Sequence, residues 1–216
     1  MGSLTFQTPA ASNGDVLLAL LSHNAVDTVS AAPSGWTLVG TLGSGADVLD
    51  LYAHMVDGSE LASIVFTLAS NIDEWQGELV TLTGTSPGAL IESSASASFS
   101  ATTTLTTAGA TAQQAIDLIL VAWTCSGTPT LTLPAGFTAV DSFSTAVVTS
   151  RAMLVGYKLA GATGALTFAG ATASGNATGR SFTLVLRDRA PIAPAPLVDL
   201  VPGNIGLIGK DTRPAR

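Results

Sequence analysis

Short apolar runs alternate with turn-forming residues along the first 187 positions of this 216-residue chain. The runs are rich in Val, Leu, Thr and aromatic residues, and clusters of Gly, Pro, Asn and Ser separate them, as is typical of β-strands. The strands predicted in the first half are residues 3–8, 15–22, 36–42, 47–56, 62–69 and 76–83. Those predicted in the second half are residues 95–106, 116–124, 128–132, 137–143, 149–159, 164–168 and 180–187. No convincing amphipathic helix interrupts them, so the pattern predicts an all-β protein, an antiparallel β-sandwich of jelly-roll type.

The Ser-rich segment Ser94–Thr107 has the composition of a low-complexity linker, but its residues alternate. Ala95, Ala97 and Phe99 are separated from one another by single serines. A period of two is that of a strand with one buried face. We therefore expect a strand here and not a flexible connection.

The apolar pattern occurs twice along the chain. The run Asp15–Leu21 returns as Asp117–Trp123, and Pro33–Val39 (Pro-Ser-Gly-Trp-Thr-Leu-Val) returns as Pro134–Val140 (Pro-Ala-Gly-Phe-Thr-Ala-Val). Self-similarity at a fixed spacing indicates repeated structural units. The sequence thus predicts an internal duplication.

The two halves of this duplication comprise about residues 1–93 and 94–187. The repeat is consistent with two architectures: two β-sandwiches in tandem, or a single sandwich in which each half of the chain forms one part. One domain over residues 1–187 is favoured, because the central apolar run of each half needs a partner sheet and the connection near 84–94 does not resemble a hinge.

The amino-acid composition is typical of extracellular β proteins and of subunits that pack against neighbours in an assembly. Charged residues make up 11% of the chain, less than half of the roughly 25% usual in soluble domains. Hydroxyl and small residues take their place, and such a surface can be buried against a neighbour with little desolvation of charge. The segment Met1–Phe6 lacks the basic and apolar regions of a signal peptide, and no apolar run approaches the ~20 residues that span a bilayer. We expect synthesis in the cytoplasm and no membrane contact.

Charge is distributed unevenly between the halves. Residues 1–93 carry a net charge of −10 and residues 94–186 a net charge of +1, and no Lys or Arg occurs before position 151. An acidic first half argues against nucleic acid as a partner, because phosphate contacts need Lys and Arg. Opposite signs at the two ends would suit association between copies of the chain, although solubility alone also explains the charges.

The sequence contains no set of residues typical of catalysis. A P-loop, a dinucleotide fingerprint, a nucleophile elbow and zinc-ligand spacing are all absent, and the single cysteine, Cys125, is expected in the core. We predict no catalytic residues, no metal site and no cofactor. Acidic residues cluster in two places, which could indicate glycoside hydrolysis or calcium binding but are interpreted as solvated turns. These acidic residues are Asp47, Asp50, Asp57 and Glu60, and Asp73, Glu74 and Glu78.

Three aromatic positions bear on recognition. Trp36 and Phe137 occupy matching places in the two halves, which indicates a core role. Trp75 has no aromatic counterpart near Gly179 and is the candidate for an exposed recognition residue, which would stack on a sugar or fill a pocket of a partner.

The chain changes character after Leu186. A Pro-rich stretch from Arg187 to Leu197 favours an extended conformation, and the apolar and basic residues that follow suggest an arm, residues 188–216, that lies against a surface. Docking on the arm's own body and docking on a neighbour both remain open, with a neighbour favoured. The candidate interaction residues of the arm and its approach are Arg187, Arg189, Leu197, Leu200, Ile205, Leu207, Ile208, Lys210 and Arg213.

Four segments of the first half resemble a β-sandwich domain that is widespread in virion proteins of tailed bacteriophages and in prophage regions. They are Gly14–Ala19, Pro33–Val39, Leu51–Ala53 and Leu79–Gly84. In that family a Gly-Asp-led apolar strand is followed by Pro-x-Gly-Trp and then by a weaker second half. The resemblance covers residues 10–187, concerns scaffold positions, and implies no catalytic residue.

This resemblance implies a non-enzymatic structural protein of the virion, made in the host cytoplasm. A capsid decoration or cement protein is the favoured role, with other virion proteins and copies of itself as partners. The alternative is a tail- or fibre-associated module that binds a cell-surface glycan through Trp75. A glycoside hydrolase on a sandwich scaffold is the least favoured hypothesis.

Overall fold

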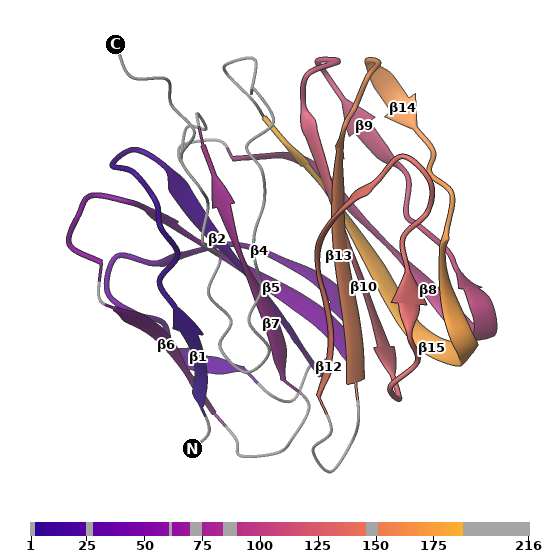
Figure 1. Cartoon of the computed structure of the whole chain (residues 1–216), viewed down its shortest axis with the longest axis horizontal. Helices are drawn as coiled ribbons and strands as arrows, with labels where there is room; N and C mark the ends of the chain where they lie inside the picture. Colours follow the sequence, from indigo (N-terminus) through magenta and orange to yellow (C-terminus); the bar gives the residue numbers. More distant parts are fainter. Residues whose placement is uncertain are drawn as a thin grey trace.

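The protein is all-β in the part of the chain that the structure describes. A computed structural model describes residues 3–24, 28–60, 62–69, 75–83, 90–145 and 151–187, with the backbone alone over 141–145. Its regular elements are strands, no helix occurs in these ranges, and every strand pair is antiparallel (Figure 1). The predicted class of antiparallel all-β protein is confirmed.

The strands follow the predicted positions closely. Those of the first half are β1 (Ser3–Gln7), β2 (Val16–His23), β3 (Val29–Ala31), β4 (Thr37–Ser44), β5 (Asp47–Met55), β6 (Ser63–Leu68) and β7 (Gln76–Leu82). Those of the second half are β8 (Ile91–Leu105), β9 (Ala110–Ala112), β10 (Leu118–Ser126), β11 (Leu131–Thr132), β12 (Thr138–Thr145), β13 (Arg151–Leu159), β14 (Gly164–Leu166) and β15 (Ala171–Leu186). The Ser-rich segment is a strand as expected, since it forms most of β8.

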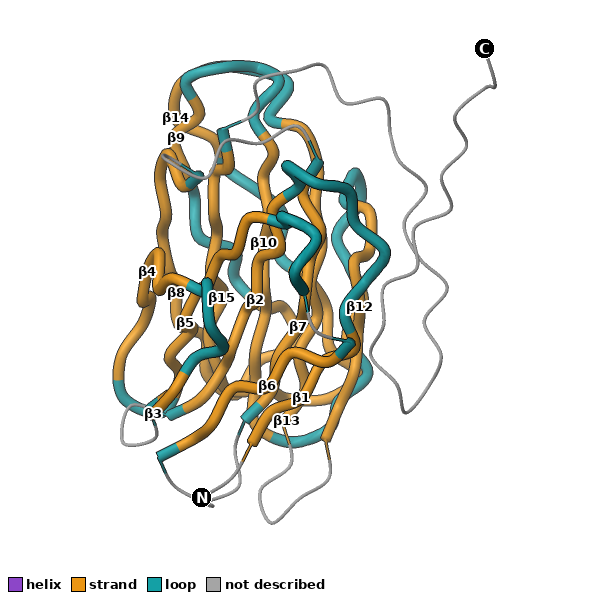
Figure 2. The backbone as a smooth tube through the Cα atoms, turned by 90° about the vertical axis from the view of Figure 1, so that its left-hand side faces the viewer, coloured by secondary structure: helices purple, strands orange, loops and turns teal. Residues whose placement is uncertain are grey.

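Two inner sheets form the centre of the molecule. One has the strand order β4-β5-β2-β7, and the other has the order β12-β13-β10-β15, with β8 on the far side of β15. β1, β6 and β3 form an outer sheet beside the first inner sheet. β9 and β14 pair with each other, and β11 pairs with the beginning of β15, on the outer side of the second inner sheet. Figures 1 and 2 show the resulting stack of layers.

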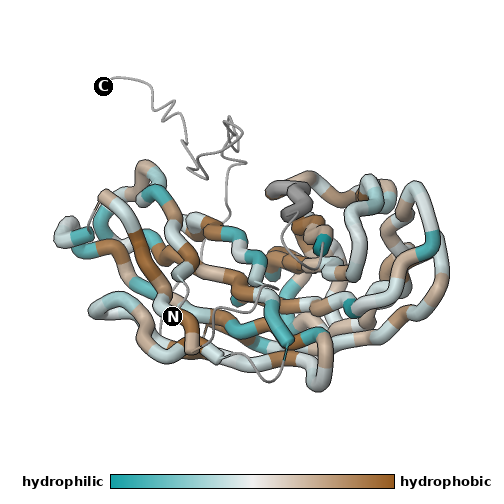
Figure 3. The backbone as a smooth tube through the Cα atoms, turned by 90° about the horizontal axis from the view of Figure 1, so that it is seen from below, coloured by the Kyte–Doolittle hydropathy of each residue, from teal (hydrophilic) through white to brown (hydrophobic). Residues whose placement is uncertain are grey.

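The central strands are buried on both faces, which explains their uninterrupted apolar sequences. On β2, Leu18 and Leu20 face the second inner sheet, while Leu17 and Leu21 face β1 and β6. β10 behaves likewise: Leu120 faces the first inner sheet, and its neighbours in the strand face β11 and β14. Apolar positions accordingly lie along the strands between the layers (Figure 3).

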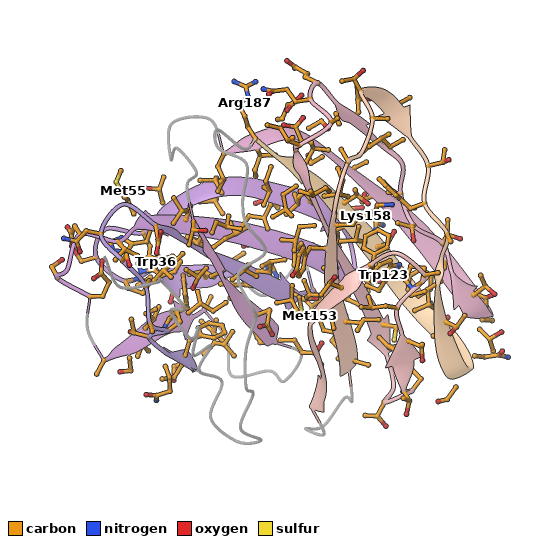
Figure 4. The ribbon with its side chains drawn as sticks, turned by 45° about the horizontal axis from the view of Figure 1, so that its top comes forward. Trp36, Met55, Trp123, Met153, Lys158 and Arg187 are labelled. Atoms are coloured by element: carbon orange, nitrogen blue, oxygen red, sulfur yellow. The ribbon has the colours of Figure 1, made fainter. Side chains whose placement is uncertain are left out.

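One apolar cluster joins the two halves. It combines Leu18, Leu20 and Leu51 of the first half with Met153 and Phe182 of the second, all fully or almost fully buried (Figure 4 labels Met153). At roughly 1.5–3 kcal/mol for each large apolar side chain removed from water, this cluster is a major contribution to folding. β2 and β10, the strands that contain the repeated Asp-led apolar run, therefore each pack against strands of the other half.

Candidate functional site

Trp75, the predicted recognition residue, lies just before β7 and packs against the end of β2. Its ring stacks on the ring of His23, with centroids 4.3 Å apart and planes 20° from parallel. The indole is partly buried, and its Nε1 has no hydrogen-bond partner among the described residues. One face of Trp75 is therefore covered within the protein, and a role in binding a partner stays a prediction.

His23 belongs to a buried polar chain that crosses the first inner sheet. Its Nε2 lies 3.0 Å from Oδ2 of Asp50 on β5, and its Nδ1 lies 2.6 Å from the carbonyl oxygen of Asn24. Thr41 on β4 donates to the other carboxylate oxygen of Asp50 at 2.6 Å. His23 is 2% exposed and Asp50 7% exposed. The interpretation of Asp50 as a solvated turn residue is wrong, because β5 places its side chain between β2 and β4.

The order of the hydrogen-bonded side chains Thr41, Asp50 and His23 fits a structural role better than nucleophilic catalysis. In a catalytic triad the imidazole lies between the hydroxyl and the carboxylate, so that it can take the proton of the hydroxyl. Here Asp50 lies between Thr41 and His23. Both nitrogens of His23 lie within hydrogen-bonding distance of oxygen atoms, so the ring is held between Asn24 and Asp50 and is covered on one face by the indole of Trp75.

A second histidine organises the turn after β5. Nε2 of His54 lies 3.2 Å from Oε1 of Glu60, and its Nδ1 lies 3.0 Å from the carbonyl oxygen of Gly35. Glu60 also accepts from the backbone N–H groups of Asp57 and Gly58, at 2.7 and 3.0 Å. Burial raises the pKa of Glu60, but these hydrogen bonds together outweigh it and lower that pKa below its usual value.

His54, Asp57 and Glu60 are also the set that could hold a metal ion among the described residues, with ligand atoms within 4.8 Å of one another. Hydrogen bonds inside the turn already account for His54 and for both oxygens of Glu60, and Oδ1 of Asp57 accepts from Ser59 at 2.5 and 2.9 Å. We assign no metal to this turn.

Trp36 and Phe137, which occupy matching places in the sequence, each lie against a side chain from a neighbouring strand. The ring of His54 stacks on Trp36 at 5.5 Å, and Nζ of Lys158 lies 5.5 Å from the ring centroid of Phe137 (Figure 4 labels Trp36 and Lys158). Both aromatic residues are partly buried and pack against the outer apolar clusters, as a core role requires. Phe168 completes the second arrangement, with Nζ of Lys158 at 6.0 Å.

Sequence reasoning missed one pair of acidic residues. Asp117, before β10, is fully buried, and its Oδ2 accepts from the backbone N–H groups of Gln113 and Gln114 at 3.1 and 2.7 Å. Its Oδ1 and both carboxylate oxygens of Glu92 on β8 are buried without a hydrogen-bond partner of normal geometry among the described residues. Burial, followed by the hydrogen bond and the negative charge of Asp117, raises the pKa of Glu92. Glu92 and Asp117 are far apart in the sequence, so the pattern of apolar and polar residues gave no indication that they are close in space.

The remaining predicted site residues fall into two groups. Arg187 is partly buried, and its backbone N–H donates to the carbonyl oxygen of Leu90 at 3.1 Å. Arg189, Leu197, Leu200, Ile205, Leu207, Ile208, Lys210 and Arg213 lie outside the described residues, as do Asp73 and Glu74. Glu78, interpreted as solvated, is instead fully buried on β7, and Asp47 is paired with Arg151. Cys125 is buried in the core as predicted.

Comparison with family models, with curated proteins and with solved structures found no match for this chain. The resemblance to the phage virion domain therefore stays a prediction based on the sequence segments that carry it. In the described part of the chain there is no helix long and apolar enough to cross a membrane.

Proposed function

We propose that the protein is an internally duplicated β-sandwich of jelly-roll type that serves as a non-enzymatic structural protein of a virion, as a capsid decoration or cement protein. It would assemble on other virion proteins and on copies of itself through its exposed surfaces and its C-terminal arm.

The order of strands supports the duplication. The first inner sheet has the order β4-β5-β2-β7, and the second has the same order with the corresponding strands, β12-β13-β10-β15. The bulges match too: the register of β4 and β5 shifts at Val39, and that of β12 and β13 shifts at Val140, the matching residue of the repeat. A bulge is a specific local irregularity that is conserved within families, so its recurrence supports a common origin better than apolar runs do.

The turns before the central strands support it further. Asp15 accepts from the backbone N–H of Ser12 at 2.8 Å, and Asp117 accepts from that of Gln114 at 2.7 Å, with the same separation in sequence. The carbonyl oxygen of Asp15 accepts from the N–H of Val56, and that of Asp117 accepts from the N–H of Ala160, both at 2.9 Å. The repeated aspartates are thus turn-forming residues that fix the start of a strand.

The jelly-roll type is supported by the second half. Its eight strands occupy an inner and an outer layer, and its first strand, β8, pairs with its last, β15. A jelly roll has eight antiparallel strands in two sheets, connected as two Greek keys, and the strand number and the double layer are the features that support this type here.

The observation that carries the proposed role is that the segments of the resemblance build this repeated scaffold. Gly14–Ala19 leads into β2, Pro33–Val39 leads into β4, and Leu79–Leu82 of the fourth segment forms the end of β7. The surface suits assembly as well: on β8 the exposed side chains include Ser94, Ser96 and Ser98, which a neighbour can cover without burying charge.

A tail- or fibre-associated glycan-binding module is the second proposal, and the geometry supports it less. A sugar-binding aromatic residue presents an open face to its ligand. Trp75 has one face on His23 and packs against the cluster around β2 and β6, which leaves at most its other face for a sugar.

Mass spectrometry and immunogold electron microscopy of purified phage particles that carry this gene test the main proposal. We expect the protein on the capsid, in a fixed ratio to the major capsid protein, and electron cryomicroscopy would then locate it. A chain that stays in the soluble fraction would contradict the virion role. Glycan-array binding that is lost in Trp75→Ala would favour the second proposal, provided that the thermal stability of the variant is unchanged.

A further inference from the structure

The second inner sheet ends on one side with a long strand that carries almost no charge. This strand, β8 (Ile91–Leu105), pairs with β15, and no described strand pairs along its other edge. The other edge strands of the described sheets have eight residues or fewer. A free strand edge presents a row of N–H and C=O groups that can pair with a strand of another molecule. β8 therefore offers the longest pairing edge among the described strands.

One stretch of β8 lacks the usual protection of a strand edge. Natural proteins protect such edges with charged side chains, proline or bulges. After Glu92, β8 contains no charged residue and no proline. Its register with β15 is unbroken from Ser93 to Phe99, and register shifts lie on both sides of this window. Beyond the window Ala101 has a φ of 48°, in the left-handed region, where the strand is irregular. A regular, uncharged edge of limited length results.

The sequence of this window is self-complementary. Ser94–Ser98 reads Ser-Ala-Ser-Ala-Ser in both directions, and Ser96 is the centre both of this run and of the window Ser93–Phe99. In an antiparallel pair of two such strands about a two-fold axis at Ser96, serine opposes serine and alanine opposes alanine. Hydroxyl groups on directly opposite residues can hydrogen-bond across the strands. A two-fold contact requires a surface that is complementary to itself, and this window meets that requirement.

The two faces of the window would also match those of a second copy. Ala95 and Ala97 are half-buried and share a face of the strand with Phe99, which packs in the outer apolar cluster of the second half. A two-fold axis perpendicular to the sheet keeps each face on its own side, so the exposed polar face stays exposed in the pair. The exposed residues of this polar face are Ser94, Ser96 and Ser98.

The distribution of charge favours β8 over the edge strand of the first inner sheet. Residues 1–93 carry a net charge of −10, and residues 94–186 carry a net charge of +1. Pairing through β8 joins the two nearly neutral halves, whereas pairing through β4 would join two strongly acidic halves. Because like charges that are brought together oppose association, the second half is the better place for a contact between identical chains.

We propose that β8 of one molecule pairs antiparallel with β8 of a second copy about a two-fold axis at Ser96, so that their second inner sheets form one continuous sheet. The inference deepens the self-association put forward under Proposed function and rests on it, but it does not require the virion role. The irregular residues on both sides of the window Ser93–Phe99 limit the pairing to this stretch. Each copy covers the β8 edge of the other, so pairing through β8 closes at a dimer.

Analytical ultracentrifugation of the purified full-length protein tests the proposal. We expect an equilibrium between monomer and dimer, and a monomer at every concentration would overturn the proposal. Ser96→Lys should raise the dissociation constant of the dimer at least about fivefold, because the axis places the two new cations opposite each other.

Thr103→Lys is the matched control for this variant. Thr103 is exposed on the same strand but lies beyond the window, so the substitution adds the same charge and should leave the dissociation constant unchanged. Circular dichroism should give both variants the Tm of the native protein, since both replace exposed side chains. Equal dissociation constants for the two variants would show that the dimer forms elsewhere, and would overturn the proposal.

Disulfide cross-linking tests the register. Directly opposite residues have Cβ atoms about 4.5–5.5 Å apart, close to the Cβ separation of a disulfide, so Ser96→Cys should form a cross-linked dimer under mild oxidation. Ser94 opposes Ser98 of the second copy and lies four residues, roughly 13 Å, from its own equivalent. Ser94→Cys and Ser98→Cys should therefore cross-link when mixed and not separately. The native protein should not cross-link, because Cys125 is buried.

The cross-linking outcomes separate this inference from the proposed role. Cross-links of Ser94→Cys to itself, without any of Ser96→Cys, would overturn the axis at Ser96. All these measurements use the protein in solution and no particle. A dimer can therefore be found for a chain that is absent from virions, and a virion protein can prove to be a monomer in solution.

Discussion

Arg151 and Asp47 form an ion pair that connects the two halves of the molecule. Nη1 of Arg151, at the start of β13, lies 3.1 Å from Oδ1 of Asp47, at the start of β5, and Nη2 donates to the carbonyl oxygen of Ala46. The carbonyl oxygen of Arg151 accepts from Nε2 of Gln76 on β7 at 2.6 Å. The side chain of Arg151 is 4% exposed. One of the four basic residues of the second half therefore contacts the acidic first half within a single chain.

Replacing Arg151 by Met should lower the free energy of unfolding by about 3 kcal/mol. The substitution keeps an apolar stem of similar length but removes a buried cation from Asp47, and breaking such a pair typically costs this much. For a chain of this size we expect a fall in Tm of about 6–12 °C, measured by circular dichroism. Lys158→Met removes a cation that lies over aromatic rings and should cost less than about 1 kcal/mol. Equal losses in the two variants would argue against a special role of the ion pair.

Cys125 should be inert toward thiol reagents in the folded protein. It is fully buried on β10, and burial raises the pKa of its thiol to about 11. The reactive thiolate is therefore scarce at pH 8. We expect labelling by a chromogenic disulfide reagent only as the protein unfolds in denaturant, at the rate of global unfolding. Fast labelling of one thiol per chain under native conditions would show that β10 opens locally.

Gly179 should not tolerate a side chain. A Cβ at this position of β15 would overlap the carbonyl oxygen of Thr124 and the Cα of Cys125, which are backbone atoms of the paired strand β10. Because a backbone cannot rotate away, we expect Gly179→Ala to lower the free energy of unfolding by about 2–4 kcal/mol in urea denaturation. Gly175→Ala, in the same strand, has no atom within 4 Å of the new Cβ and should stay within about 1 kcal/mol of the native protein.

The strands could be predicted because their signals are local. Every strand predicted in the first half is present, and the alternation of Ala95, Ala97 and Phe99 identified β8. The first part of β15, Ala171–Gly179, was missed because it consists of Ala, Thr, Ser, Gly and Asn, residues that indicate a loop. It is a strand because β8 and β11 pair with it, and long-range pairing of this kind overrides local preference.

The polar interior could not be predicted in the same way. Asp50 looked like a turn residue because other acidic residues surround it in the sequence, but its neighbours in space are His23 and Thr41. Glu92 and Asp117 meet because the beginning of β8 lies beside β9, where the hydroxyl of Ser93 donates to the carbonyl oxygen of Thr111. Contacts between residues on different strands depend on register and on which face each side chain takes, and a shift of one residue reverses that face.

Glu60→Gln should destabilise the protein at neutral pH and less so in acid. The carboxylate of Glu60 accepts three hydrogen bonds, and its pKa is lower in the folded than in the unfolded chain. A lowered pKa means stability that is present above the unfolded value and is lost as pH falls through the folded value. We expect a loss of about 1 kcal/mol at pH 7, measured by urea denaturation, that shrinks below pH 4. A loss independent of pH would show that shape, and not charge, matters in this turn.

Glu92→Gln should stabilise the protein above neutral pH, in contrast to Glu60→Gln. Burial and the neighbouring Asp117 raise the pKa of Glu92, so the folded protein holds a proton there more tightly than the unfolded chain does. A raised pKa contributes stability that is complete below the unfolded pKa and is lost as pH rises through the folded pKa. Gln keeps the shape of the protonated acid without the charge, so the Tm of Glu92→Gln should exceed that of the native protein at pH 8, by about 2–4 °C for each kcal/mol of relieved repulsion. The Tm values of the variant and of the native protein should converge near pH 4, where the native carboxyl is protonated as well.

Asp117→Asn does not isolate this effect, because Oδ2 of Asp117 also holds the turn through Gln113 and Gln114. If Glu92→Gln melted at the native temperature at every pH, the carboxyl pair would have no energetic consequence for the fold.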